Sequence, residues 1–94
     1  MTDFINNPQV EENKVLYRGF YSDDVRVVRV EEGIEEISEN AFRDSETLEE
    51  VYLPRSLAKI SACAFSGCKN LKSVTVREGL LSIGDEAFAF CPSL

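Results

Sequence analysis

Residues 34–56 read IEEISENAFRDSETLEEVYLPRS, residues 57–79 read LAKISACAFSGCKNLKSVTVREG, and residues 80–94 read LLSIGDEAFAFCPSL. These segments are three copies of one pattern that begins at Ile34, Leu57 and Leu80 with a constant period, the last copy being shortened. Their apolar positions recur in fixed columns, whereas the positions between them are mostly polar and vary. This division is typical of a solenoid, in which the inward side chains of each turn stack on those of the next. The columns are Ile34/Leu57/Leu80, Ile37/Ile60/Ile83, Ala41/Ala64/Ala87, Phe42/Phe65/Phe88, Leu48/Leu71/Leu94, Val51/Val74 and Leu53/Val76.

Each complete copy contains a strand-like part and a turn-like part. The strand-like parts, residues 48–53 and 71–76, end in alternating apolar residues, and strands stacked once per repeat in the same direction form a parallel sheet. The turn-like parts carry Ala-Phe among small polar residues. For them we predict one helical or 3₁₀ turn on the outer face, with Ser38 and Ser61 as N-caps. They span residues 38–45, 61–68 and 84–91.

The segment before the repeats has a different pattern. Residues 1–13 carry a turn signal, Asn6-Asn7-Pro8, and little periodicity, so we expect them to be loosely held. Two strand-like runs, KVLYRGF at 14–20 and VRVVRV at 25–30, flank the turn residues YSDD and predict a β-hairpin that caps the solenoid. The second run is a degenerate half repeat, because Val28 and Val30 lie one repeat period before Val51 and Leu53. The predicted domains are therefore the N-terminal segment with its hairpin, 1–33, and the repeats, 34–94, in copies 34–56, 57–79 and 80–94.

The repeated phrase L-x-x-I-x-x-x-A-F-x-x-C-x-x-L-x-x-V-x-L-P resembles the BspA-type, or Treponema-type, leucine-rich repeat, which is found mainly in bacterial proteins. The first copy matches with Ser45 in place of the usual cysteine, and the second with Arg77 in place of the usual proline. The resemblance implies a mostly β leucine-rich repeat solenoid of the α/β type that is right-handed, with its parallel sheet on the concave face. It also implies a range of roles in adhesion and host interaction, because members are commonly surface proteins.

Charge and composition argue against some classes of binding partner. The formal charge of −7 and the pI of about 4.5 argue against nucleic acid, which requires a basic surface. No run of 18 apolar residues predicts a membrane span. The N-terminus does not resemble a signal peptide, so we expect a cytoplasmic location for the chain as written, and the cell surface if it belongs to a longer protein. The acidic residues between Glu31 and Glu50 either attract a basic partner or form a solvated face.

The sequence offers no catalytic or cofactor chemistry. Histidine is absent and the cysteines number three, so a four-ligand zinc site cannot be built from Cys and His within one chain. Cys68 and Cys91 share a column with Ser45, which favours a ladder of small buried residues, with a disulfide between turns as the alternative. Cys63 is expected to be an exposed thiol. We expect no enzyme activity, no cofactor and no metal.

Two surfaces are candidates for binding another protein. The first is the concave face, whose columns are Val27/Glu50/Ser73, Arg29/Tyr52/Thr75 and Glu31/Pro54/Arg77. Tyr52 and Arg29 are the strongest candidates there, because aromatic and guanidinium groups dominate interface energies. The second is the end of the solenoid, where Phe65, Val74, Val76 and Phe88 are expected to be uncovered.

These surfaces support two hypotheses of function. The first is a non-catalytic protein-interaction module, which is either complete or the N-terminal part of a longer array. The alternative is a structural or assembly unit that forms homo-oligomers through its solenoid ends.

Overall fold

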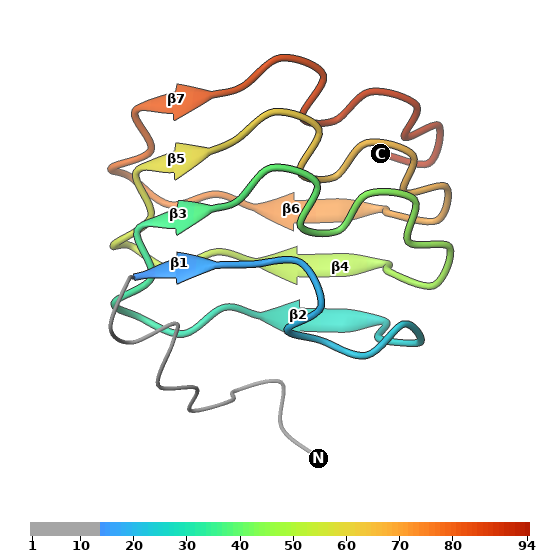
Figure 1. The fold of residues 1–94 in the computed structure, drawn as a ribbon, viewed down its shortest axis with the longest axis horizontal. Helices are drawn as coiled ribbons and strands as arrows, with labels where there is room; N and C mark the ends of the chain where they lie inside the picture. Colours follow the sequence, from blue (N-terminus) through green and yellow to red (C-terminus); the bar gives the residue numbers. More distant parts are fainter. Residues whose placement is uncertain (1–13) are drawn as a thin grey trace.

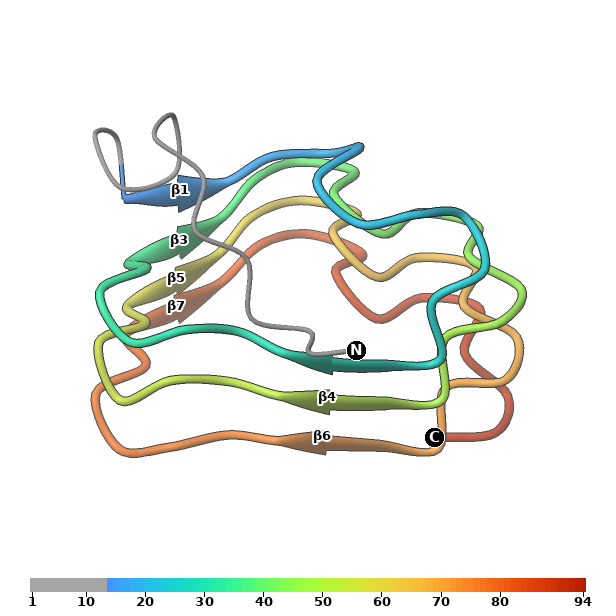
Figure 2. The ribbon, with the colours of Figure 1, turned by 90° about the horizontal axis from the view of Figure 1, so that it is seen from below.

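A computed structural model describes residues 14–94, and the expectation for residues 1–13 lies outside this part of the chain. The chain winds into a solenoid in which two parallel sheets lie on opposite sides of the coil (Figures 1 and 2). The four-stranded sheet contains β1 (Val15–Leu16), β3 (Glu36–Ile37), β5 (Lys59–Ile60) and β7 (Ser82–Ile83) in that order. The three-stranded sheet contains β2 (Val27–Arg29), β4 (Glu50–Tyr52) and β6 (Ser73–Thr75).

The strand register follows the repeat period. Val28 pairs with Val51 and Val51 with Val74, and Ile37 pairs with Ile60 and Ile60 with Ile83. Each of these steps is one repeat period, so the apolar columns of the sequence are stacked rows in the structure. The prediction of a mostly β solenoid with a parallel sheet is confirmed. The four-stranded sheet, however, was not expected, because each of its strands is only two residues long.

Phenylalanine rings form the central stack of the core. The rings of Phe42 and Phe65 lie 5.2 Å apart at an angle of 8°, and those of Phe65 and Phe88 lie 5.2 Å apart and parallel. Tyr21 continues the stack at 5.8 Å from Phe42. Rows of buried aliphatic side chains from both sheets surround these rings. The phenylalanine column of the sequence is therefore the central stack of the core.

The outer segments form successive tight turns, and the expected helical or 3₁₀ turn is wrong, since no helix occurs within residues 14–94. Asn40 and Asp44 have φ angles of 61° and 63°, and a residue in this left-handed region interrupts a right-handed helix. The backbone of one turn bonds instead to the next, as where Phe42 N–H donates to Ala64 C=O at 2.7 Å. The N-cap assignments are also wrong, because both hydroxyls act as donors: that of buried Ser61 donates to Glu36 at 2.9 Å, and that of Ser38 donates to the carbonyl of Glu39 at 3.5 Å.

The predicted N-terminal β-hairpin is wrong as well. β1 does not pair with β2; it pairs in parallel with β3 and extends the four-stranded sheet. Its register is two residues shorter than the repeat period, since Leu16 pairs with Ile37, whereas Val28 in the same turn pairs with Val51. The first turn is thus a repeat that lacks two residues. The half repeat predicted around β2 lies within this fuller turn, where Val28 pairs with Val51.

The cysteine column is a ladder of free thiols within the chain. Cys68 is buried, and its thiol donates to the carbonyl of Phe42 in the preceding turn at 3.1 Å; Cys91 does the same to Phe65. Burial raises the pKa of Cys68 to about 12, with the neighbouring Cys91 thiol adding to the effect. Cys63, expected to be exposed, is half-buried and has a φ of 58°.

Candidate interaction surface

The outward residues of the three-stranded sheet form what we call the three-stranded face: Val27, Arg29, Glu50, Tyr52, Ser73 and Thr75. The register places them in the two predicted columns, since Val27 aligns with Glu50 and Ser73, and Arg29 aligns with Tyr52 and Thr75. Alternation along each strand keeps Val28, Val51 and Val74 on the opposite, inward side. Sequence reasoning therefore found the residues that the structure brings together on this face.

The centre of the three-stranded face is a fixed cluster of Arg29, Tyr52 and Glu50. The guanidinium carbon of Arg29 lies 4.3 Å from the centroid of the Tyr52 ring, a cation–π arrangement. The Tyr52 hydroxyl donates to Glu50 Oε1 at 2.7 Å. This hydrogen bond, together with the charge of Glu50, raises the pKa of Tyr52, and the Arg29 cation opposes that effect. The phenol is held on two sides by neighbours on β2 and β4.

Beside this cluster, a row of charges joins the three turns. Glu49 lies between Arg26 and Lys72, at 3.1 Å from the Arg26 nitrogen and 3.9 Å from the Lys72 nitrogen. Next to the four-stranded sheet, Lys14 Nζ lies 3.8 Å from Glu35 Oε2. Two acidic side chains of the second turn, Glu35 and Glu49, therefore face cations of adjacent turns. This pairing leaves a weaker acidic field for a partner than the sequence alone indicates.

The third predicted column does not form one exposed row. Pro54 is buried, whereas Glu31 is half-buried and Arg77 is exposed. Arg77 lies instead at a hollow of about 370 Å³, which it lines together with Arg55 and Glu78. Sequence reasoning missed Arg55. The sequence did contain a sign of it, because Arg55 is the one cation in a column whose other members, Glu32 and Glu78, are anions.

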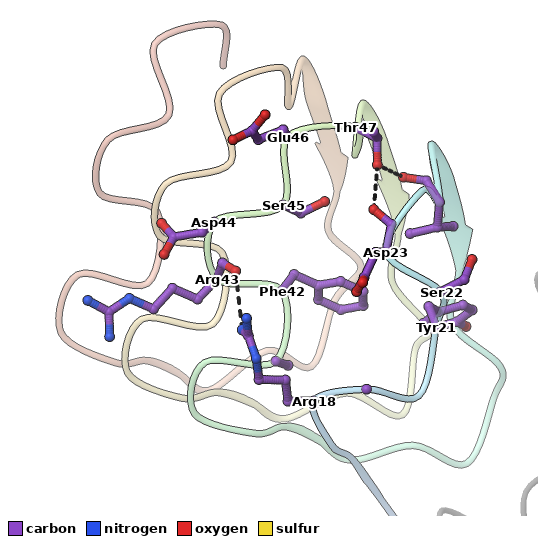
Figure 3. Close-up of a pocket in the computed structure, with 13 residues that line it drawn as sticks. Arg18, Tyr21, Ser22, Asp23, Phe42, Arg43, Asp44, Ser45, Glu46 and Thr47 are labelled. Atoms are coloured by element: carbon purple, nitrogen blue, oxygen red, sulfur yellow. Dashed lines mark hydrogen bonds between the residues drawn. The ribbon is translucent and has the colours of Figure 1, made fainter.

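A second hollow, of about 390 Å³, lies on the outer side between the first and second turns (Figure 3). It is where the first turn lacks two residues, since four positions separate Tyr21 from Val25 but six separate Phe42 from Leu48. Thr47 crosses the gap, its hydroxyl lying 2.8 Å from the carbonyl of Val25 and 3.1 Å from that of Asp23. These bonds are internal, so the hollow is a seam between turns of unequal length.

Arg18 closes the same seam from its other side. Its guanidinium donates to the carbonyl of Asn40. It also donates to the carbonyl of Arg43 at 3.2 Å (Figure 3). In later turns, the counterparts of the Arg43 carbonyl accept backbone N–H groups from the preceding turn: Ser66 C=O accepts from Asp44 at 2.7 Å, and Ala89 C=O accepts from Gly67 at 2.8 Å. The first turn is two residues too short to align with the second along its whole length. The Arg18 side chain therefore supplies hydrogen bonds to carbonyls of the second turn.

The repeat architecture agrees with the comparison to known families. The model of the BspA type leucine rich repeat region (6 copies) matches residues 13–94. The chain belongs to the BspA-type leucine-rich repeat family. This match begins two residues before β1, in agreement with the first turn being a member of the repeat array. Neither the curated proteins nor the solved structures with which the chain was compared contain a match.

The far end of this leucine-rich repeat array exposes residues of the inward columns. Val76 is 50% exposed, whereas Leu53 in the same column is 3% exposed; Ile83 is 55% exposed, whereas Ile60 is fully buried. Val74 and Phe88 are half-buried. The prediction that Phe65 lies on this end surface is wrong. The Phe88 ring stacks over the Phe65 ring, and Phe65 is fully buried.

The described part of the leucine-rich repeat array has neither a metal-binding cluster nor a membrane-spanning helix. Within residues 14–94, no group of three or more His, Cys, Asp or Glu side chains is arranged to hold a metal ion. The same part of the chain contains no helix of the length and apolarity needed to cross a membrane.

Proposed function

We propose that this leucine-rich repeat array is a non-catalytic protein-interaction module that binds its partner through the three-stranded face. The observation that carries the proposal is the cluster in which Arg29 lies over Tyr52 while Tyr52 donates to Glu50. Tyrosine and arginine contribute most to binding energy when they are central in an interface. The family supports the same general role, because leucine-rich repeats commonly mediate protein interactions.

Preorganisation makes this cluster suited to binding. A side chain that is already fixed loses less conformational entropy when it enters an interface, and each immobilised long side chain otherwise costs about 0.5–1.5 kcal/mol. Tyr52 is half-buried, so a partner meets an aromatic edge that is accessible but held in place. The Tyr52 ring is the largest side chain on this part of the face, because its neighbours there are the smaller Val27, Ser73 and Thr75.

The experiment is affinity capture with the intact chain, comparing Tyr52→Ala with Tyr17→Ala. Tyr17 is a matched control, because it follows β1 in the other sheet and is 42% exposed. We expect Tyr52→Ala to abolish capture of a protein that the unmodified chain and Tyr17→Ala both retain, with unchanged circular dichroism. Capture that survives Tyr52→Ala, or that both variants lose equally, contradicts the proposal.

A second candidate function is self-association through the exposed end, favoured by the exposure of Val76 and Ile83. In this arrangement the free edges of β6 and β7 meet the end of another copy. Sedimentation velocity over a range of concentrations tests it, with Val76→Lys as the variant. A concentration-dependent dimer that Val76→Lys converts to monomer supports self-association, and a monomer at all concentrations rejects it.

A further inference from the structure

The hollow lined by Arg55, Arg77 and Glu78 has a net positive lining, although the protein as a whole is acidic. Arg55 lies in the corner between β4 and β5, and Arg77 and Glu78 lie in the corner between β6 and β7. Two guanidinium groups and one carboxylate give the lining a formal charge of +1, whereas the whole chain carries −7. All three residues are exposed, so a ligand can reach them.

These two arginines differ from the others in having no side-chain partner within residues 14–94. Each other arginine has one: Arg18 bonds to two backbone carbonyls, Arg26 pairs with Glu49, Arg29 lies over Tyr52, and Arg43 donates to Asn40. The guanidinium groups of Arg55 and Arg77 form no ion pair or hydrogen bond in this part of the chain, not even with Glu78 beside them.

One turn earlier, the chain fills the equivalent position with a carboxylate of its own. Glu32 Oε2 accepts a hydrogen bond from the backbone N–H of Arg55 at 3.1 Å. Glu32, Arg55 and Glu78 follow one another at the repeat period, so the N–H of Glu78 is the counterpart of the N–H of Arg55. The residue before Glu78 in this column is Arg55, which has no acceptor in its side chain. The Glu78 N–H consequently has no hydrogen-bond partner within the described residues.

We propose that this corner binds a carboxylate from an aspartate or glutamate side chain of a protein partner. The carboxylate accepts from the Glu78 N–H, as Glu32 accepts from Arg55 one turn earlier, and it pairs with the guanidinium groups of Arg55 and Arg77. Guanidinium groups suit this role, because their forked donors match the two oxygens of a carboxylate. The inference rests on the proposed function for the statement that a protein supplies the carboxylate, and it adds that the bound segment is acidic.

The location is consistent with a shared binding surface. Tyr52 ends β4 and Arg55 follows it by three residues, so the hollow lies at the carboxyl-end edge of the three-stranded face. A partner segment that contacts Tyr52 can therefore extend a carboxylate to this corner.

The test is a titration of the isotope-labelled chain with an acetylated, amidated tetraglutamate peptide, followed by nuclear magnetic resonance. We expect a saturable downfield shift of the Glu78 amide proton. Arg55→Gln and Arg77→Gln should each weaken binding by about fivefold, the upper range for exposed ion pairs. Glu78→Gln should strengthen binding by a similar factor, because it removes the only anion in the lining. Arg43→Gln, which removes a positive charge elsewhere, should change the affinity by less than about twofold.

Three results would overturn the proposal. The first is a Glu78 amide that does not move, and the second is equal weakening by all three arginine variants, which indicates diffuse attraction. The third is inorganic phosphate or tetraglutamine binding as tightly as tetraglutamate, which indicates an unselective site.

This test is separable from that of the proposed function. Partner capture that depends on Tyr52 but not on Arg55 or Arg77 rejects only the carboxylate site. Saturable tetraglutamate binding at Glu78 without Tyr52-dependent capture rejects only the proposed function.

Discussion

Replacing Phe65 with alanine should destabilise the solenoid much more than the same replacement of Phe88. Phe65 is fully buried and its ring stacks on two others, each at 5.2 Å, whereas Phe88 is half-buried and stacks on Phe65. Truncating a core phenylalanine costs about 3–5 kcal/mol. Because Phe88 is incompletely buried and belongs to one stacked pair instead of two, Phe88→Ala should cost less, about 1.5–2.5 kcal/mol.

These costs are large for so small an array. At about 0.05–0.15 kcal/mol per residue, the free energy of unfolding of such a chain is about 5–14 kcal/mol. Phe65→Ala therefore removes a substantial part of it, and at the lower limit it abolishes folding. Phe65→Leu keeps an apolar side chain and should cost about 1–2 kcal/mol, so it provides a folded variant at the same position.

Urea unfolding followed by far-ultraviolet circular dichroism measures these differences, since the chain contains no tryptophan for fluorescence. We expect the order of stability to be unmodified chain, Phe65→Leu and Phe88→Ala close together, and Phe65→Ala last. If Phe65→Ala and Phe88→Ala differ by less than about 0.5 kcal/mol at equal m-values, the doubly stacked ring does not have the special weight assigned to it.

Three further predictions concern titratable groups and charges. The folded-state pKa of Cys68 is raised to about 12, so stability should fall as pH rises above about 9, where only the unfolded thiol ionises, and Cys68→Ala should lessen this slope in pH-dependent urea unfolding. Glu50→Gln should lower the pKa of Tyr52 toward its usual value of 10, as seen by ultraviolet titration of the phenol; an unchanged titration would refute the assigned cause. Glu49→Lys should destabilise the chain more than Glu49→Gln, by about 1 kcal/mol or less at low salt, and equal stabilities of the two would contradict the charge row.

The apolar columns made most of the solenoid predictable. The constant repeat period aligned Ile37 with Ile60 and Val51 with Val74, and the strand register follows the same alignment. The exposed columns containing Arg29 and Tyr52 followed from alternation along a strand. The cation–π contact was not predictable, because it depends on the side-chain conformations of two residues in adjacent turns.

The first turn was misread because its repeat is two residues short. One fixed period aligns Val28 correctly but not Leu16, whose partner Ile37 lies less than one period away. With β1 outside the pattern, a hairpin was the simplest interpretation of two nearby strand-like runs. Allowing a deletion between Tyr21 and Val25 would have placed Tyr21 in the aromatic column and β1 in the array.

The outer turns were misread for a different reason. Their left-handed residues include Cys63, Glu86 and Phe90, which have no local preference for positive φ. The strain is offset by hydrogen bonds to the adjacent turn, such as Cys63 N–H to Asp85 C=O at 3.0 Å. A local signal such as Ser38 before Ala-Phe therefore indicated a helix, whereas contacts between turns determine the conformation.

The charges of this array also bear on how its turns find their order. Repeats with similar apolar columns can stack on one another in more than one order, which is why repeat proteins are prone to misassembly. In the row Arg26, Glu49, Lys72, each neighbour has the opposite sign, whereas direct stacking of the first turn on the third would bring Arg26 against Lys72. Each exposed pair contributes about 1 kcal/mol or less, but the incorrect order loses two attractions and gains a repulsion. In this row the anionic Glu49 is thus the layer between two cations, and Arg55 and Arg77 are the two arginines whose guanidinium groups the internal pairing leaves without a partner within residues 14–94.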